Sequence, residues 1–174
     1  MKIYPCEMAN EELTNSILAD IKENPNNNPN NINWSKLCFN YILSDDFIRE
    51  NKNYIRWDVV ASWQKLSDNI IEEFLDNFDW ERIAYFQVLS ESFIRKHIAK
   101  IHTKICWSNL CHNQKLSEEF IREFQNEVCW RDISQFQKLS KEFIIEFANR
   151  ICFDYLLNND TISQEVKDYC KMFV

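Results

Sequence analysis

The chain has 174 residues, of which 45% are hydrophobic and 27% charged, a net charge of −7 and no glycine. Without glycine it cannot build a phosphate-binding glycine-rich loop, a dinucleotide fingerprint or a nucleophile elbow, because these need positive φ angles or a close backbone approach. The negative charge also disfavours nonspecific nucleic-acid binding, which requires a broad basic face. The composition is typical of a globular protein with one sizeable core.

Hydropathy and cysteine content indicate the cellular compartment in which the protein is expected. No run of about 18 apolar residues predicts a membrane span, and residues 1–10 lack the apolar core of a signal peptide. Seven cysteines, an odd number without a CxxC pair, favour free thiols in a reducing compartment over a disulfide framework. We therefore expect a protein that is neither secreted nor embedded in a membrane.

Residues 1–33 are predicted to form an N-terminal half repeat that acts as a capping helix. Ile17, Leu18 and Ile21 stand at helical spacing after Leu13-Thr14 and match the second half of the repeat described below. Residues 24–31 consist only of asparagine and proline. They cannot form a helix and have nothing to bury, so we expect a flexible loop there.

From Trp34 onward the chain repeats itself in six copies. Trp34, Trp57, Trp80, Trp107 and Trp130 are separated by 23, 23, 27 and 23 residues, and Phe153 follows 23 residues later. When this Trp or Phe is counted as position 1, a Leu-Ser or Ile-Ser pair occupies positions 10 and 11 of all six copies. Residues 34–174 are predicted to form a single domain. The predicted repeat core comprises Trp34, Trp57, Trp80, Trp107, Trp130, Phe153, Leu43, Leu66, Leu89, Leu116, Leu139 and Ile162, and the predicted helix caps are Ser44, Ser67, Ser90, Ser117, Ser140 and Ser163.

Each copy is predicted to contain two helices. Positions 1, 4, 5 and 8 share one helical face, which predicts a first helix of about eight residues, and the mostly small residues at position 5 suit the close approach of another helix. Serine at position 11, followed by acidic residues, predicts the start of a second helix of about eleven residues with apolar positions 14, 15, 18 and 22. The four extra residues between Trp80 and Trp107 predict a second helix longer by one turn. Asparagine is the expected left-handed residue at helix ends.

A hairpin of two such short helices cannot cover its own apolar residues, so its stability must come from its neighbours. The predicted fold is therefore all-α. We expect an α-solenoid of about six short two-helix hairpins with an N-terminal capping helix, or a compact helical bundle if the superhelix is tight. The pattern leaves the handedness open.

The motif resembles a tandem repeat family of giant DNA viruses of the mimivirus kind. The residues that carry the resemblance are Leu116-Ser117-Glu118-Glu119-Phe120-Ile121-Arg122-Glu123-Phe124, followed by Trp130 and Gln137-Lys138-Leu139-Ser140. The resemblance covers residues 34–174. The first and last copies depart from it, with Tyr41 and Asp160 in place of glutamine and Phe153 in place of tryptophan. The resemblance implies a viral protein with a binding role, located in the host cytoplasm or the virion.

One cluster has the residue types of a metal site, because imidazole and thiolate groups at short spacing can hold zinc. It comprises His97, His102, Cys106, Cys111 and His112. The places of these residues in the repeat argue against a metal. Cys111 occupies the small position 5, Cys106 precedes its tryptophan, and His97 occupies position 18, where other copies have phenylalanine. We expect packing roles for them, and neither a metal nor a cofactor.

Two rows of side chains are candidates for binding. Position 8 holds Gln64, Gln87, Gln114 and Gln137, which are predicted to satisfy backbone groups near the Leu-Ser turn; the alternative is a ladder that reads a ligand. Position 7 holds Trp63, Phe86, Asn113 and Phe136 in the middle copies. These are exposed-edge candidates for partner anchoring, or else they pack on the next copy.

No group of residues predicts catalysis. Acidic residues occur mostly at helix starts, where capping explains them, and we find neither an isolated carboxylate pair nor a Ser-His-Asp arrangement. We therefore expect a noncatalytic module that binds a host or virion protein through exposed helix positions. The alternatives are a protein that sequesters a small molecule or nucleotide in a pocket and a structural virion subunit. Homo-oligomerisation also stays open.

Overall fold

The computed structural model describes residues 32–173, which contain only helices and turns and no strand. The predicted all-α fold is confirmed for this part of the chain. Two compact units, Met1–Gln87 and Val88–Val174, divide the chain between the two helices of the third copy. The predicted half repeat in residues 1–33 and the loop at residues 24–31 lie outside the described residues, apart from Ile32 and Asn33. The single domain stays a prediction.

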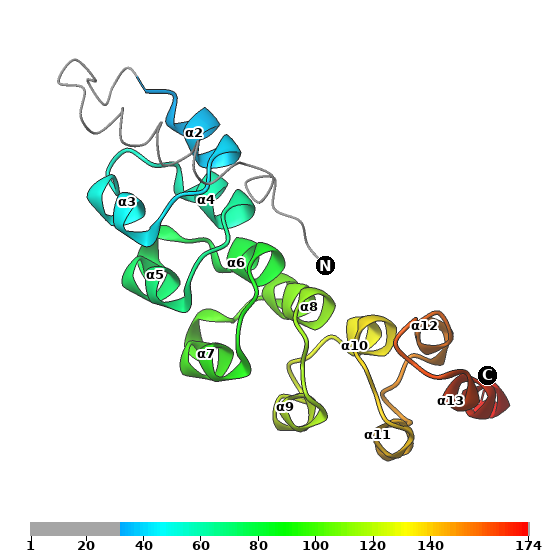
Figure 1. The fold of residues 1–174 in the computed structure, drawn as a ribbon. Coiled ribbons are helices and arrows are strands. Elements are labelled where there is room, and N and C mark those ends of the chain that lie inside the picture. The colour runs from blue at the N-terminus through cyan, green and yellow to red at the C-terminus, as the bar shows by residue number, and fades with distance from the viewer. Residues whose placement is uncertain (1–31, 174) are drawn as a thin grey trace. The chain divides into compact units, whose positions relative to one another are not determined.

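In the first unit, consecutive hairpins lie side by side. The first helices of the hairpins form one row, in which α2 packs on α4 and α4 on α6. The second helices form another row (Figure 1). The elements are α2 (Trp34–Asn40), α3 (Asp45–Glu50), α4 (Trp57–Trp63), α5 (Asp68–Glu73), the 3-10 helix η3 (Leu75–Asn77) and α6 (Trp80–Phe86).

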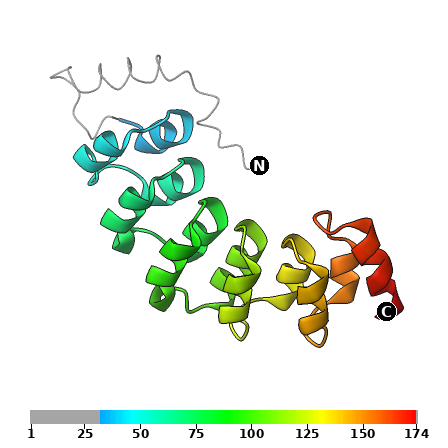
Figure 2. The same ribbon diagram turned by 60° about the horizontal axis from the view of Figure 1, so that its bottom comes forward.

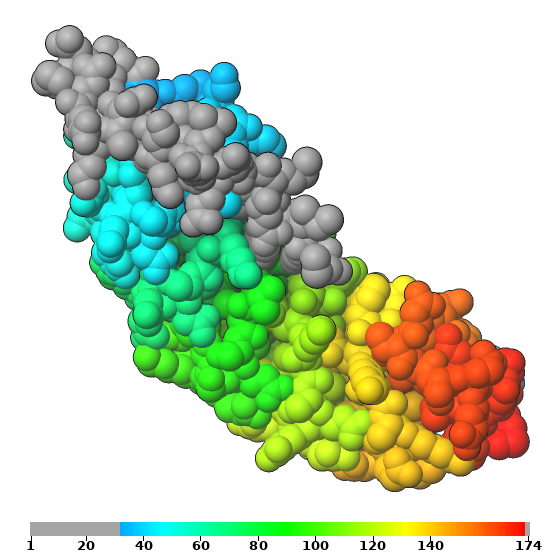
Figure 3. All heavy atoms as spheres, viewed as in Figure 1, coloured from blue at the N-terminus to red at the C-terminus, as the bar shows by residue number. Residues whose placement is uncertain are grey.

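The second unit has the same construction. Its first helices pack in the order α8, α10 and α12, and its second helices follow one another beside them (Figure 2). Drawn as spheres, the atoms of neighbouring hairpins within the second unit lie directly against one another (Figure 3). The elements are α7 (Glu91–Lys96), η4 (Ile98–Lys100), α8 (Lys104–Asn113), α9 (Glu118–Glu123), α10 (Trp130–Phe136), α11 (Lys141–Glu146), α12 (Phe153–Leu157), α13 (Gln164–Cys170) and η5 (Lys171–Phe173).

The core is formed by aliphatic and small residues more than by the repeated tryptophans. Position 4 is buried in every copy, as are the Leu or Ile of the Leu-Ser and Ile-Ser pairs; position 4 is Leu37, Val60, Ile83, Leu110, Ile133 and Leu156. Position 5 is also buried in copies one to five (Cys38, Ala61, Ala84, Cys111 and Ser134).

The tryptophans predicted to belong to the repeat core are less buried than its aliphatic residues in most copies. Trp107 is buried, with 6% of its surface exposed, but Trp34, Trp57, Trp80, Trp130 and the equivalent Phe153 are only half-buried. Each of these half-buried residues stands at the first residue of a short helix. The Trp57 ring lies 4.8 Å from that of Phe74 and 5.1 Å from that of Phe78.

The second helices are shorter than predicted. Those of copies one to five have six residues and α13 has seven, against the eleven expected. The backbone at position 18 is no longer helical, as at Phe74 with φ −114° and ψ 31°, and a turn follows. This turn returns the apolar residue at position 22 to the core, where Ile55, Phe78, Ile101, Val128 and Ile151 are buried.

The predicted extra turn in the second helix of the third copy is also wrong. The four additional residues leave α7 at six residues and instead lengthen the next first helix, α8, to ten residues. Thr103 explains the difference, because its side chain accepts a hydrogen bond from the Cys106 N–H (3.0 Å) and so begins α8 one turn before Trp107.

The serine caps are confirmed. At each second helix the serine hydroxyl accepts a hydrogen bond from the backbone N–H three residues later, which satisfies one of the N–H groups that have no partner within the helix. The caps are Ser44, Ser67, Ser90, Ser117, Ser140 and Ser163.

The expected left-handed asparagines are absent, since no residue in the described part of the chain has a positive φ. The first helix instead ends at position 8 in extended backbone, as Gln137 does with φ −94° and ψ 148°. The last carbonyls of such a helix need partners from elsewhere. They find them in the following copy.

We call this arrangement the glutamine clamp. The side-chain amide of Gln137 donates to the carbonyl oxygens of Cys111 (2.6 Å) and Gln114 (2.7 Å), and its oxygen accepts from the Leu116 N–H (2.9 Å). All three partners belong to the preceding copy. The same three bonds join Gln64 to Cys38, Tyr41 and Leu43, and Gln87 to Ala61, Gln64 and Leu66.

Candidate binding surface

The glutamines of the clamp are not available to a ligand. Gln64, Gln87, Gln114 and Gln137 are only 2–4% exposed, and backbone groups are the hydrogen-bond partners found for them. This confirms the interpretation that they satisfy the backbone rather than read a ligand. In the last copy, Asn159 at position 7 makes the two donor bonds of a clamp, to the carbonyls of Ser134 (2.9 Å) and Gln137 (2.8 Å), while its oxygen accepts from the Thr161 N–H of its own copy.

The residues of the candidate metal cluster point to different surroundings. His102 is exposed, with Nδ1 3.0 Å from the carbonyl of Lys100. His97 lies with its ring 4.5 Å from that of Phe93, and the ring of exposed His112 lies 3.9 Å from that of Phe136. Among the described residues, no three His, Cys, Asp or Glu side chains are placed to hold a metal ion.

The cysteines serve packing and capping. Cys106 and Cys111 are buried, and Cys111 Sγ accepts a hydrogen bond from the Cys129 N–H at 3.4 Å. In the next copy the Ser134 hydroxyl takes the same place and accepts from the Cys152 N–H at 2.9 Å. Burial raises the pKa of the Cys111 thiol to about 12, so the thiol stays protonated and is a poor nucleophile.

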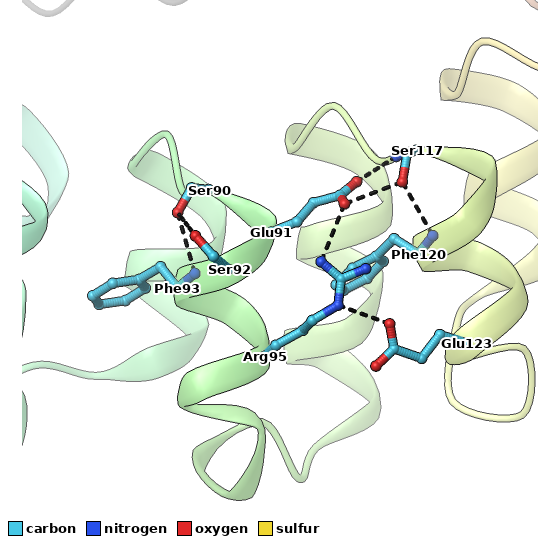
Figure 4. Close-up of polar contacts among 8 residues, drawn as sticks. All are labelled: Ser90, Glu91, Ser92, Phe93, Arg95, Ser117, Phe120 and Glu123. Atoms are coloured by element: carbon cyan, nitrogen blue, oxygen red, sulfur yellow. Dashed lines mark hydrogen bonds and ion pairs between the residues drawn. The ribbon is translucent and has the colours of Figure 1, made fainter.

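A polar ladder joins the second helices of the second unit (Figure 4). Arg95 donates from Nε to Glu123 on the following second helix at 2.7 Å, and its guanidinium lies 4.9 Å from the centre of the Phe120 ring. Glu91 accepts from the Ser117 N–H (2.5 Å) and from its hydroxyl (3.1 Å). These carboxylates and the arginine therefore hold consecutive copies in register.

Arginine–glutamate pairs also join the second helices of other neighbouring copies. Arg122 pairs with Glu146 at 2.8 Å in the second unit, and Arg49 pairs with Glu73 at 2.7 Å in the first. One buried carboxylate lies between first helices: Asp132, only 3% exposed, accepts from the Ser108 hydroxyl. Its other oxygen lies 3.3 Å from Nε of Arg131. Each of these carboxylates and arginines has a partner within the chain, so none of them needs a substrate to account for its position.

In the first unit, positions 3, 6 and 7 of the first helices share one helical side because of their spacing. We call it the first-helix face. It consists of Lys36, Phe39 and Asn40 on α2, Val59, Ser62 and Trp63 on α4, and Arg82, Tyr85 and Phe86 on α6.

Contacts between neighbouring helices fix the first-helix face. The Phe39 and Trp63 rings meet edge to face at 4.8 Å, joining α2 to α4. Arg82 Nη1 donates to the Ser62 hydroxyl at 2.8 Å, joining α6 to α4. Phe39 and Tyr85 are exposed, at 38% and 42% of their surface.

The second unit has a related surface on α8, α10 and α12. Its rings are Phe136, which lies tilted against His112, and Tyr155, which is 40% exposed and lies 6.0 Å from the Arg131 guanidinium. Asn113, at the equivalent of the Phe136 position, uses its side-chain amide to donate to the Asn109 carbonyl at 3.0 Å.

The predicted binding residues lie on these surfaces but are less exposed than expected. Trp63, Phe86, Asn113 and Phe136 are all half-buried. The more exposed rings stand at position 6, as Phe39 and Tyr85 do, and sequence reasoning did not select that position. The spacing from position 3 to positions 6 and 7 is the signal that could have identified it.

Two hollows in the described part of the chain are candidate sites for a small ligand. One, of about 120 Å³, is lined by Ile144, Ile145, Ala148, Phe153 and Tyr169. The other, of about 360 Å³, is lined by Lys52, Asn53, Trp57, Glu73, Phe74 and Asn77. The first is smaller than typical ligand pockets, and the carboxylate in the second already pairs with Arg49.

No known protein family, curated protein sequence or solved structure matches this chain. Across residues 32–173, every helix is too short or too polar to cross a lipid bilayer.

Proposed function

We propose that this chain is a noncatalytic helical-repeat protein that binds a protein partner through its first helices. The observation that carries the proposal is the first-helix face, where two rings, Phe39 and Tyr85, keep about two fifths of their surface exposed on a preformed support. Aromatic residues held in this way are the residue types that anchor protein interfaces. Repeat arrays commonly use such extended surfaces for binding.

The use of the polar side chains supports a noncatalytic role. Catalytic groups need an acid, base or nucleophile placed at a cleft with a pKa suited to its task. Here Glu91, Asp132 and the clamp glutamines bind other parts of the chain, and the Cys111 thiol is held protonated. The resemblance to the giant-virus repeat family directs the search for the partner to host and virion proteins.

Site-specific photo-crosslinking tests the proposal. Benzoylphenylalanine replaces Tyr85 on the first-helix face, and in a matched control it replaces Glu72, which is exposed on α5. After irradiation in host lysate, we expect a discrete protein adduct from position 85 that is absent from position 72. Equal labelling from both positions, or no adduct from either, contradicts the proposal. An adduct with a second copy of the chain points to a homo-oligomer instead.

A further inference from the structure

The charges of the first unit are unevenly distributed. Positions 3, 6 and 7 of α2, α4 and α6 carry two cations, Lys36 and Arg82, and no carboxylate, although the chain as a whole has a net charge of −7. The second half of the second copy, residues 67–79, holds five acidic residues and no basic one. Acidic residues have thus been kept off the first-helix face and gathered elsewhere.

Position 2 of α4 and of α6 carries a carboxylate beside these residues. Asp58, at position 2 of α4, is paired with Arg56, whose Nη2 lies 3.1 Å from its Oδ2. Salt-bridging to Arg56 lowers the pKa of Asp58 although its partial burial acts in the opposite direction. Glu81, at position 2 of α6, directly precedes Arg82 in the chain. Lys36 is exposed, and the Arg82 guanidinium is held in place by the Ser62 hydroxyl, so the first-helix face itself carries positive charge only.

The spacing limits what can bind. Neighbouring packed helices lie about 8–10 Å apart, and the Arg82 guanidinium reaches Ser62 on α4, the helix that packs on α2, so the two charges are separated by about one such spacing. An extended peptide covers that distance with about three residues. The Phe39 and Trp63 rings stand on α2 and α4, and the Tyr85 and Phe86 rings, 4.7 Å apart, stand on α6.

We propose that the first-helix face binds an extended, acidic segment of the partner protein. Two carboxylates about three residues apart pair with Lys36 and Arg82, and apolar side chains beside them lie against the Phe39, Trp63 and Tyr85 rings. The inference rests on the proposed function and names the partner's chemistry. The pairing of opposite charges selects the partner, and the rings supply the apolar contact.

Fluorescence anisotropy with two labelled peptides tests this pairing. Both peptides have a two-residue core of phenylalanine and proline, which keeps them extended. Glutamate stands at both ends of the core in one peptide and lysine in the other. At low ionic strength we expect the acidic peptide to bind at least tenfold more tightly than the basic one, and the difference to shrink as salt is added.

A charge reversal identifies the cation. Lys36→Glu is an exposed change that leaves the packing contacts of α2 in place, so folding is preserved. We expect it to weaken the acidic peptide about threefold to tenfold and to strengthen the basic peptide. The matched control is Lys52→Glu, the same charge change at an exposed residue of the same copy that lies outside the first-helix face. It leaves both affinities unchanged.

Three results overturn the inference: equal affinity for the two peptides, no binding of either, or the same response to Lys36→Glu and Lys52→Glu. Dimerisation in sedimentation experiments that Lys36→Glu abolishes also overturns it, because a second copy then occupies the face. These failures are distinguishable from failure of the proposed function. If position 85 still forms its discrete adduct, a protein binds there and only its predicted acidic character is wrong.

Discussion

Replacing Gln137 with leucine removes one clamp while keeping a side chain of similar size. Gln137 is 3% exposed, and three backbone groups depend on it: the carbonyls of Cys111 and Gln114 and the N–H of Leu116. Each buried group left without a partner costs about 1–3 kcal/mol, so three cost roughly 3–9 kcal/mol. Relaxation of the turn and the added apolar burial offset part of this. We expect a loss of about 3–5 kcal/mol in the free energy of unfolding.

Urea denaturation followed by circular dichroism measures this loss, and amide hydrogen exchange localises it. The Leu116 N–H, which donates to Gln137, is expected to lose protection before the amides of α9 do. Gln135→Leu is the matched control, because Gln135 is half-buried on the same helix and contributes no clamp bond. It should change stability by less than about 0.5 kcal/mol. Equal effects of the two variants, or an unchanged Leu116 exchange rate, would refute the reasoning.

A second variant separates lost hydrogen bonds from lost volume. Gln137→Glu can still accept from the Leu116 N–H, but an ionised carboxylate cannot donate to the two carbonyls. Burial near these oxygens raises the folded-state pKa of the new carboxyl above the unfolded value of about 4.3. The destabilisation is therefore complete above the folded-state pKa and shrinks as the pH falls through it. Gln137→Leu shows no such recovery, and identical pH profiles for the two would contradict the clamp.

Three further predictions concern the core, the caps and the thiols. Trp107→Ala should cost about 3–5 kcal/mol in thermal or urea unfolding, because this ring is buried; a cost below about 1 kcal/mol would show that the ring does not support the core. Ser117→Ala should cost about 0.5–2 kcal/mol through the lost cap to the Phe120 N–H, and Ser117→Asp, usually a good cap, should not recover it because the Glu91 carboxylate lies 3.1 Å from the hydroxyl. Cys111 should resist alkylation in the folded chain at pH 8, and rapid labelling of the native thiol would contradict this. The free energy of unfolding should also fall as the pH rises above the ordinary thiol pKa of 9.0. The unfolded thiol then loses its proton, while the folded thiol, with a pKa of about 12, keeps it.

The all-α fold and the serine caps were predictable because their signals are local. A repeated serine before acidic residues determines a helix start within a few residues, and the structure has each cap where expected. The lengths of the second helices were not predictable from apolar spacing. Ile55 and Ile151 return to the core through a turn, and a turn can give the same spacing as another helical turn.

The binding surface was only partly predictable. Trp63 and Phe136 were identified by type and position, but exposure depends on the neighbouring helix, which sequence spacing within one copy does not describe. Phe39 covers part of Trp63 and becomes the more exposed ring itself. Similarly, the donor bonds of the clamp come from Asn159 in the last copy, where α12 ends at Leu157, two residues before it.

The glutamine clamp also bears on how arrays of this kind can change in length during evolution. Because each clamp takes its amide from one copy and its carbonyls from the one before, duplicating or deleting a whole copy brings matching donors and acceptors to the new junction. A deletion of part of a copy would separate the donors from the acceptors and leave buried carbonyls such as that of Cys111 without a hydrogen-bond partner. Selection should therefore tolerate changes of copy number far better than small insertions or deletions within the first helices.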